Sequence, residues 1–215
     1  KEHSIESFDE NPMVAVMKRQ YRMNKGIFEL VKPIYEIHKE LQLIDQKQKE
    51  ANDLLCLQID GDEETRQTAD NKTISNKREG DAVAEIVHDF SNQRSLYPGI
   101  KTIGVITGYR AQENYIRKSL KDIGKIPGLE IGTFDRFQGK EFDLVIISLV
   151  RTEKLGFIEN VRRMNVAISR AKEHLIIVGN FDKLNLISKK LKKREDCANP
   201  EEEEFVRKRL IPQLN

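Results

Sequence analysis

Three short segments carry side chains that could bind a phosphate group. The first is 20–23 (QYRM), where an aromatic ring and a guanidinium stand side by side after the apolar run 13–17, which could be a short buried strand. The second is 131–141, where a predicted strand ends in polar groups and Gly139 permits backbone conformations or close approaches that a side chain would block. The third is 165–172, which contains an arginine and a lysine. Together they are candidates for a site that binds a phosphorylated ligand.

Each segment also has a more ordinary interpretation. A loop with one glycine is usually a turn. Arg163 and Arg170 are seven residues apart in a predicted helix over 159–172, off its apolar stripe, where arginines usually form a solvated face. Tyr21 alone is more often a core or surface residue than a platform for a base. The occurrence of all three segments in one chain, in this order, favours the functional interpretation.

The usual signature of a nucleotide-binding α/β protein is missing. The sequence contains no G-x-x-x-x-G-K-[ST] phosphate loop. It also contains no strand that ends in paired acidic residues of the kind that hold Mg²⁺. We therefore expect that this chain cannot hold a triphosphate and Mg²⁺ by itself.

The elements that would position these segments follow an α/β pattern. Continuous apolar runs predict buried strands, and 3.6-residue periodicity predicts helices. The predicted strands are 102–106, 144–150 and 174–178, and the predicted helices are 79–90, 110–122 and 159–172. Alternating strands and helices indicate a mostly parallel sheet flanked by helices on both faces. The carboxyl ends of the strands then share one edge, where ligands of such folds bind.

The segment 39–78 differs from the rest because it is rich in Lys, Glu, Gln and Asp. Within it, the apolar patch 54–59 could be a strand, and 61–73 lacks periodicity and is predicted to be a mobile loop. Near the carboxyl end, Pro200 followed by four glutamates predicts the start of a terminal helix.

Composition narrows the class of protein. The 37 basic and 35 acidic residues leave a net charge of +2, so any nucleic-acid surface must come from local clustering. Two distant cysteines, Cys56 and Cys197, argue against a disulfide framework and predict an intracellular protein, cytoplasmic in a bacterium and nuclear or cytoplasmic in a eukaryote. No apolar run reaches membrane-spanning length, so no membrane partner is expected. The chain begins with Lys1 rather than Met, which predicts an excised piece of a longer protein.

The motifs resemble those of the second RecA-like domain of superfamily 1 helicases. The branch is that of the nonsense-mediated-decay helicase, senataxin and the nuclease-helicase of Okazaki-fragment processing. The matching segments are QYRMN at 20–24, motif IV at 105–112, motif V at 133–146 and motif VI at 165–172. The sequence departs from the family where Asn24-Lys25 replaces a common His-Pro and where Gly108 replaces a common proline, which is expected to loosen the motif IV loop.

This resemblance implies a single RecA-like domain over 1–215, of the P-loop NTPase fold without its own phosphate loop, with a polar, partly mobile segment at about 39–78. ATP would lie in a cleft between two such domains. The N-terminal RecA-like domain of the same parent chain would supply the phosphate loop, the Mg²⁺ ligands and the catalytic acid. The domain resembled here would supply the closing face, so the fragment alone is predicted to be inactive.

The resemblance also assigns roles at the ATP site. Arg22 and Arg170 would be catalytic arginine fingers that reach the γ-phosphate, where an arginine supplied in trans contributes on the order of 10³–10⁵ in rate. Tyr21 would stack on adenine and Glu141 would accept a hydrogen bond from the ribose. The other residues assigned to the nucleotide are Gly139, next to the phosphates, and Gln20 and Gln138, which would link the nucleotide to domain movement.

Single-stranded DNA or RNA would cross the other rim of the sheet. Thr107 and Thr133, each at the carboxyl end of a strand, resemble the threonines that bind backbone phosphates in this family, and Tyr109 and Arg151 are weaker candidates. Such contacts position a strand without reading its sequence.

Two functions remain open at this point. One is the C-terminal motor domain of an ATP-dependent DNA or RNA helicase. The other is an ATPase-inactive module, derived from a helicase, that binds nucleic acid or a partner. The intact Arg22, Glu141 and Arg170 favour the motor. The sequence does not separate DNA from RNA as the track, and translocation polarity follows only from family analogy.

Overall fold

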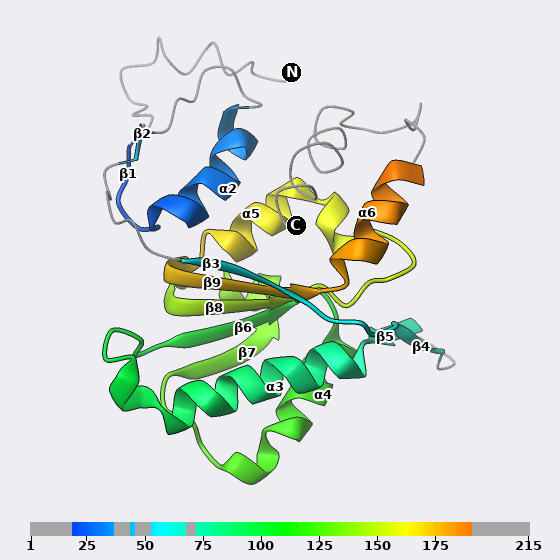
Figure 1. The fold of residues 1–215 in the computed structure, drawn as a ribbon, viewed down its shortest axis with the longest axis horizontal. Coiled ribbons are helices and arrows are strands. Elements are labelled where there is room, and N and C mark those ends of the chain that lie inside the picture. The colour runs from blue at the N-terminus through cyan, green and yellow to red at the C-terminus, as the bar shows by residue number, and fades with distance from the viewer. Residues whose placement is uncertain (1–18, 37–43, 46–52, 68–71, 191–215) are drawn as a thin grey trace.

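The computed structural model describes residues 19–36, 44–45, 53–67 and 72–190. Its centre is a five-stranded sheet in which every neighbouring pair is parallel (Figure 1). In spatial order the strands are β3 (Leu54–Gln58), β9 (Ala171–Gly179), β8 (Phe142–Ser148), β6 (Ile103–Thr107) and β7 (Leu129–Thr133). The α/β prediction with a mostly parallel sheet is confirmed, and the architecture is RecA-like.

Continuous apolar runs form the middle of the sheet because both of its faces are covered. Every residue of β8 and of β6 is buried. The strands predicted at 102–106, 144–150 and 174–178 are therefore confirmed, with β8 beginning two residues earlier and ending two residues earlier than predicted. The apolar patch at 54–59 forms the edge strand β3.

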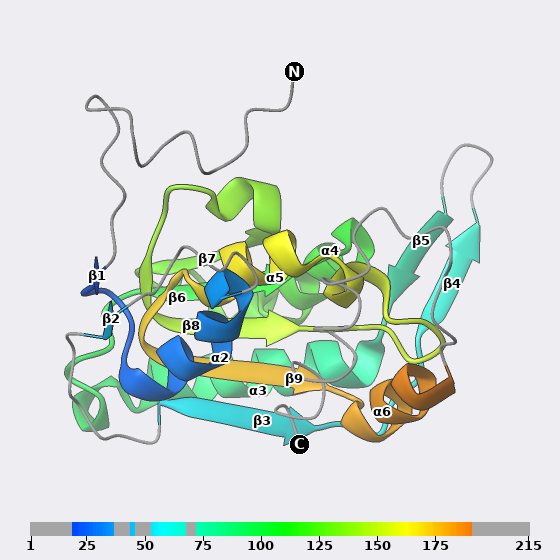
Figure 2. The same cartoon turned by 90° about the horizontal axis from the view of Figure 1, so that it is seen from above.

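Helices lie on both faces of the sheet, as predicted. The helices α2 (Lys25–Glu36), α5 (Val161–Ile168) and α6 (Phe181–Lys190) pack over one face, and α3 (Lys77–Asn92) and α4 (Arg110–Ser119) cover the other (Figure 1). Seen from above, α2 and α5 overlie β8 and β9 (Figure 2). Each face has its own buried apolar cluster, with Phe28, Met164 and Leu184 in one and Val83, Ile116 and Leu120 in the other.

The helix predicted over 159–172 is wrong at its carboxyl end. Asn160 caps the start of α5 by accepting a hydrogen bond from the backbone of Arg163, but the helix ends at Ile168. Ala171 already pairs with Phe142 in the sheet, because the β-branched run that follows is more stable in the sheet core than as further helix. Arg170 therefore lies in the connection between α5 and β9, and it is not aligned with Arg163 along one helix.

The mobile loop predicted over 61–73 is wrong for part of its length. Strand β4 (Glu64–Gln67) pairs with β5 (Lys72–Ser75) as an antiparallel hairpin that projects past the carboxyl end of the sheet (Figures 1 and 2). Both strands are short and polar, so they carry no apolar periodicity. A second small sheet pairs β1 (Arg19–Gln20) with β2 (Ile44–Asp45).

Two sequence predictions fall outside the described residues, namely the strand at 13–17 and the helix after Pro200. Within the described part of the chain, none of the helices is both long and apolar enough to span a membrane.

Candidate functional site

Arg22 and Glu141, which are far apart in sequence, meet at the amino-terminal rim of the sheet. Arg22 Nε donates to Glu141 Oε2 at 2.8 Å, and Arg22 Nη1 donates to the backbone carbonyl of Ser169 at 3.3 Å. Glu141 directly precedes β8 and Arg170 directly precedes β9. The ion pair is about half exposed, with the two side chains 42% and 48% accessible, so a ligand can reach both charged groups.

Each nitrogen atom of the Arg170 guanidinium donates a hydrogen bond that holds the side chain at the same rim. Its Nε donates to the carbonyl of Val166 at 2.9 Å, its Nη1 to the carbonyl of Lys140 at 3.0 Å and its Nη2 to Ser169 Oγ at 3.0 Å. Val166 lies in the last turn of α5, where the helix dipole favours a cation. These contacts fix the plane of the guanidinium next to the segment that carries Glu141.

The turn that carries Tyr21 and Arg22 is closed by Gln20. The Gln20 side chain accepts a hydrogen bond from the backbone N–H of Met23 at 2.9 Å and donates to the Met23 carbonyl at 3.0 Å. Asn24 attaches the turn to β9, since its backbone N–H donates to the Lys172 carbonyl at 3.1 Å. Tyr21 is left 66% exposed beside Arg22. An exposed aromatic ring next to charged groups is available for stacking on a planar ligand.

Gly139 has a conformation that favours glycine, with φ of +81°. A Cβ added there would meet no atom within 4 Å, so within this chain the residue is required by backbone geometry rather than by lack of space. Gln138 beside it is exposed, and Phe137 anchors the loop in the core.

Asp143 in β8 connects three segments at the amino-terminal rim of the sheet through hydrogen bonds and an ion pair. Asp143 Oδ2 accepts hydrogen bonds from the backbone N–H groups of Lys101 at 3.0 Å and Thr102 at 2.9 Å, and Oδ1 lies 2.9 Å from Lys172 Nζ. Burial raises the pKa of Asp143, but the hydrogen bonds from Lys172, Thr102 and Lys101 outweigh it and lower the pKa to about 2. The sequence analysis did not identify Asp143 as a site residue. A carboxylate beside an apolar strand run is nevertheless a signal, because a buried carboxylate needs hydrogen-bond donors around it.

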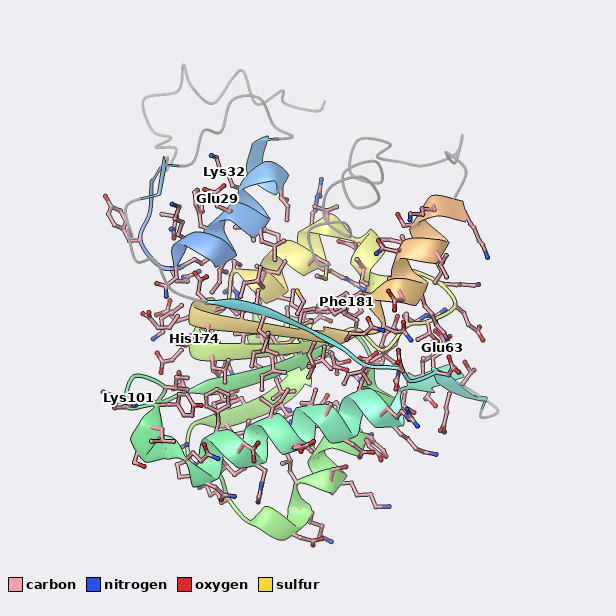
Figure 3. All side chains as sticks on the ribbon, in the orientation of Figure 1. Glu29, Lys32, Glu63, Lys101, His174 and Phe181 are labelled. Atoms are coloured by element: carbon pink, nitrogen blue, oxygen red, sulfur yellow. The ribbon has the colours of Figure 1, made fainter. Side chains whose placement is uncertain are left out.

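The opposite, carboxyl-terminal rim carries a row of hydroxyl groups. Thr107 is in register with Thr133 on one side and with Ser148 on the other, so three neighbouring strands end in hydroxyl side chains. Thr107 is fully buried, and its Oγ1 has no hydrogen-bond partner among the described residues. Figure 3 shows the separation of the rims, with Glu63 labelled at this end of the molecule and Lys101 and His174 at the other.

Beyond β8 the chain makes a strained turn. Val150 has φ of +70°, and the Arg151 N–H donates to the Leu149 carbonyl at 2.8 Å, which is the pattern of a γ-turn. A β-branched residue in this conformation is an outlier that the surroundings must enforce. Here Glu79 Oε2 accepts hydrogen bonds from the Val150 N–H at 2.8 Å and from Ser148 Oγ at 2.9 Å.

Glu79 itself is fully buried in the first turn of α3. Burial raises the pKa of Glu79 to about 7, against the hydrogen bonds from Val150, Ser148 and Leu149, which lower it. Asn76 caps the helix reciprocally, since its Oδ1 accepts from the Glu79 N–H and its Nδ2 donates to Glu79 Oε1. The Asn-x-x-Glu spacing was the sequence signal for this pair.

Arg151 follows the strained turn and is buried against Glu63, with Nε 3.1 Å from Glu63 Oε2. Glu63 also accepts a hydrogen bond from the Thr152 N–H at 2.8 Å. Tyr109 is half-buried nearby, and burial raises its pKa although the charge of Arg151 lowers it. The roles of Arg151 and Tyr109 in nucleic-acid binding stay predictions.

Gly108 does not leave room for a looser loop. A Cβ added there would lie 2.5 Å from Cδ1 of the Phe157 ring, so close packing explains the glycine and the expected loosening is not what the structure shows.

The predicted site residues thus fall into two groups. Arg22, Glu141 and Arg170 come together at the amino rim with Tyr21, Gln20, Gln138 and Gly139 around them, whereas Thr107, Thr133, Tyr109 and Arg151 lie at the carboxyl rim. In the described part of the chain, no group of three His, Cys, Asp or Glu side chains is placed to hold a metal ion.

The chain is similar in sequence to a known protein family and to several helicases. Residues 2–182 match the family described as "AAA domain". The chain is 34% identical over 205 residues to the DNA polymerase alpha-associated DNA helicase A of Saccharomyces cerevisiae, covering 84% of this chain and 29% of the relative. It is 32% identical over 185 residues to an uncharacterized ATP-dependent helicase of Methanocaldococcus jannaschii, covering 77% and 26%. It is 39% identical over 113 residues to the regulator of nonsense transcripts 1 of Dictyostelium discoideum, covering 49% and 8%. The chain therefore spans less than a third of the length of these relatives.

Proposed function

Since the chain belongs to the AAA domain family and is the C-terminal RecA-like domain of a superfamily 1 helicase, we propose that it forms half of an ATP-driven nucleic-acid motor. In this proposal an N-terminal RecA-like domain of the parent protein holds the triphosphate, and the amino rim described above closes over it. The substrate is ATP, and the track is single-stranded DNA or RNA.

The observation that carries the proposal is the convergence of Arg22, Glu141 and Arg170. Arg22 reaches the site from a turn 119 residues before Glu141, and the two arginines approach one peptide segment, since Arg22 donates to the Ser169 carbonyl and Arg170 to the Ser169 hydroxyl. A purely structural rim has no need for two partly exposed guanidinium groups next to an exposed aromatic ring. Two cations that face one ligand suit the charge that develops on a transferring phosphoryl group.

The remaining contacts suggest how each group would act. Arg170 is oriented in advance by neutral oxygen atoms, so little reorganisation would be needed to meet the γ-phosphate. Arg22 is paired with Glu141, and we propose that ATP competes for this pair, with the guanidinium turning to phosphate and the carboxylate to the ribose. Tyr21 would stack on the adenine, which contributes about 1–3 kcal/mol for an aromatic ring on a base.

Magnesium is assigned to the other domain. The groups that this chain would contribute to the site are two arginines, an aromatic ring and a backbone loop. When bound, Mg²⁺ would neutralise charge on the phosphates.

The nucleic-acid strand is placed at the opposite rim, where Thr107 and Thr133 are in register on adjacent strands. Thr133 is partly exposed and open to such a contact, whereas the Thr107 hydroxyl is fully buried and has no hydrogen-bond partner among the described residues.

The test is the steady-state ATPase activity of the parent protein with saturating single-stranded nucleic acid. Arg22→Ala and Arg170→Ala should each lower kcat by orders of magnitude with a smaller effect on KM, because a finger contact strengthens in the transition state. Arg163→Ala is the matched control, an exposed arginine on α5 outside the cluster. Near-normal kcat in both finger variants would refute the motor and leave the ATPase-inactive binding module.

A further inference from the structure

A hollow of about 660 Å³ lies between the projecting hairpin and helix α4. Strand β5 forms one side, the first residue of α3 closes one end, and the outer face of α4 forms the other side. No residue of the hollow belongs to the ATP or nucleic-acid sites described above.

Cations dominate the lining of this hollow. Lys77, Arg110 and Lys118 line it, and no acidic side chain does. Lys77 is neutralised by Glu64, with Nζ 2.8 Å from Oε1. Arg110 and Lys118 are exposed, and within the described part of the chain their side chains form no hydrogen bond or ion pair.

Two carboxylates next to the hollow, on α3 and α4, have partners other than Arg110 and Lys118. Asp81 accepts a hydrogen bond from the Tyr115 hydroxyl at 2.9 Å, and Glu113 accepts two from Arg117. Neither carboxylate forms an ion pair with Arg110 or Lys118 among the described residues, so the lining itself carries an excess of positive charge that favours anions.

The donors repeat along the helix. Arg110, Asn114 and Lys118 follow one another at intervals of four residues, so they share one face of α4 and are spaced about 6 Å apart along its axis. The hydroxyl group of Ser75 adds a further donor on the hairpin side, whereas the Ser119 hydroxyl donates to the Tyr115 carbonyl at 3.2 Å. A row of donors over about 12 Å fits a ligand with several anionic groups in a line better than a single phosphate.

The hollow adjoins the rim where the strand is proposed to cross. Arg110 opens α4 only three residues after Thr107, and Ser75 ends the hairpin one residue before the cap of α3. Both the hairpin and the start of α4 lie at the carboxyl end of the sheet (Figure 1).

We propose that this hollow binds backbone phosphates of the single-stranded nucleic acid beyond the threonine row, with Arg110 and Lys118 as the two charged contacts. The inference rests on the proposed function and extends its track by the length of α4. The contacts are to phosphate, so they are independent of base sequence. A stacked base is not part of the site, because the Tyr115 ring packs against Gly80 and its hydroxyl is bonded to Asp81.

The test is equilibrium binding of the parent protein to fluorescent oligonucleotides of increasing length at several salt concentrations. Removing two phosphate contacts from a single strand should make the slope of log K against log salt shallower by about 1.4 and weaken binding roughly 20-fold at 0.1 M salt. Arg110→Ala with Lys118→Ala should show this loss only for oligonucleotides long enough to reach α4. The matched control is Lys121→Ala with Lys125→Ala, which removes the same charge from exposed lysines outside the hollow.

The outcomes separate this inference from the proposed function. If the wild-type protein binds no nucleic acid, or Thr107→Ala and Thr133→Ala leave binding unchanged, the proposed track itself fails. If those threonine variants weaken binding but the Arg110 and Lys118 double variant matches its control in slope, only this inference is overturned. A double variant that loses affinity for free ATP while keeping full affinity for the longest oligonucleotide would also overturn it.

Discussion

Replacing Glu79 by Gln should change how the stability of this domain depends on pH. Glu79 is fully buried and bonded to Ser148 and to the N–H of Val150. Its pKa is raised from 4.5 to about 7, with burial as the largest cause. The folded state therefore holds the proton more tightly than the unfolded state does. The stability associated with this group is complete below pH 4.5 and is lost as the pH rises towards 7.

The size of the effect follows from the two pKa values. Between pH 5 and pH 8, this one group should lower the free energy of unfolding by about 2.5 kcal/mol. Glu79→Gln removes the titration, so the difference in stability between wild type and variant should shift by about that amount over the same range. At any fixed pH the variant also loses at least one hydrogen bond, because the NH₂ group of the introduced amide faces either the Asn76 Nδ2 group or the Val150 N–H, and both are donors.

The assay is urea denaturation of the 215-residue chain at intervals from pH 5 to pH 8, with the unfolding free energy taken from the linear extrapolation. Glu85→Gln, on an exposed position of the same helix, controls for the general effect of removing a carboxylate from α3. Wild-type and Glu79→Gln curves that run parallel across this range would refute the argument that the buried carboxylate titrates near neutrality.

Two further predictions concern the amino rim. In the parent protein, Tyr21→Ala should raise KM for ATP more than it lowers kcat, by roughly 5- to 100-fold, because stacking holds the base in both ground and transition states; a kcat loss equal to that of the arginine variants in steady-state assays would contradict the stacking role. Asp143→Asn should lower the free energy of unfolding by about 1–2 kcal/mol at pH 7. The reason is that a carboxyl group whose pKa is lowered from 3.8 to about 2 stabilises the folded state above pH 3.8, and this stabilisation is lost as the pH falls towards 2. Thermal unfolding from pH 7 down to pH 2 should show the wild-type advantage shrinking, and an advantage that is constant with pH would contradict it.

The sheet and the pairing of distant motifs could be predicted from the sequence. Continuous apolar runs identify β6 and β8 because strands buried on both faces have no polar side to alternate. The motif segments also point to one site, and the structure brings Arg22 next to Glu141 and Arg170 next to Lys140. Glu141 and Arg170 each directly precede a strand, so they lie at the amino-terminal edge of the sheet and not at the carboxyl edge where the α/β pattern alone predicts a ligand.

The features that could not be predicted depend on strand pairing and burial that leave no periodic pattern in the sequence. The hairpin β4–β5 has no apolar alternation and is defined by pairing across its own turn. Helix α5 ends because Ala171 pairs with Phe142 in the sheet, and the helix propensities of the residues at its end do not predict this pairing. Glu63 lies in the polar segment 39–78 and Glu79 at the start of a predicted helix, and only the fold shows that both side chains are buried under the loop after β8.

Strand β8 has a mechanical consequence for a motor built in this way. It runs from Phe142, the residue after Glu141 at one rim, to Ser148 at the other, a span of roughly 20 Å, with hydrogen-bonded neighbours on both sides and every one of its residues buried. A close-packed interior has low compressibility, so such a strand neither stretches nor buckles under load. A displacement at the nucleotide rim would reach the nucleic-acid rim without being absorbed, and the domain would act as a rigid lever. The length of a step would then be set by how far the two domains move relative to each other. Substitutions that loosen the packing around β8 should shorten the distance moved per ATP before they lower the rate of hydrolysis.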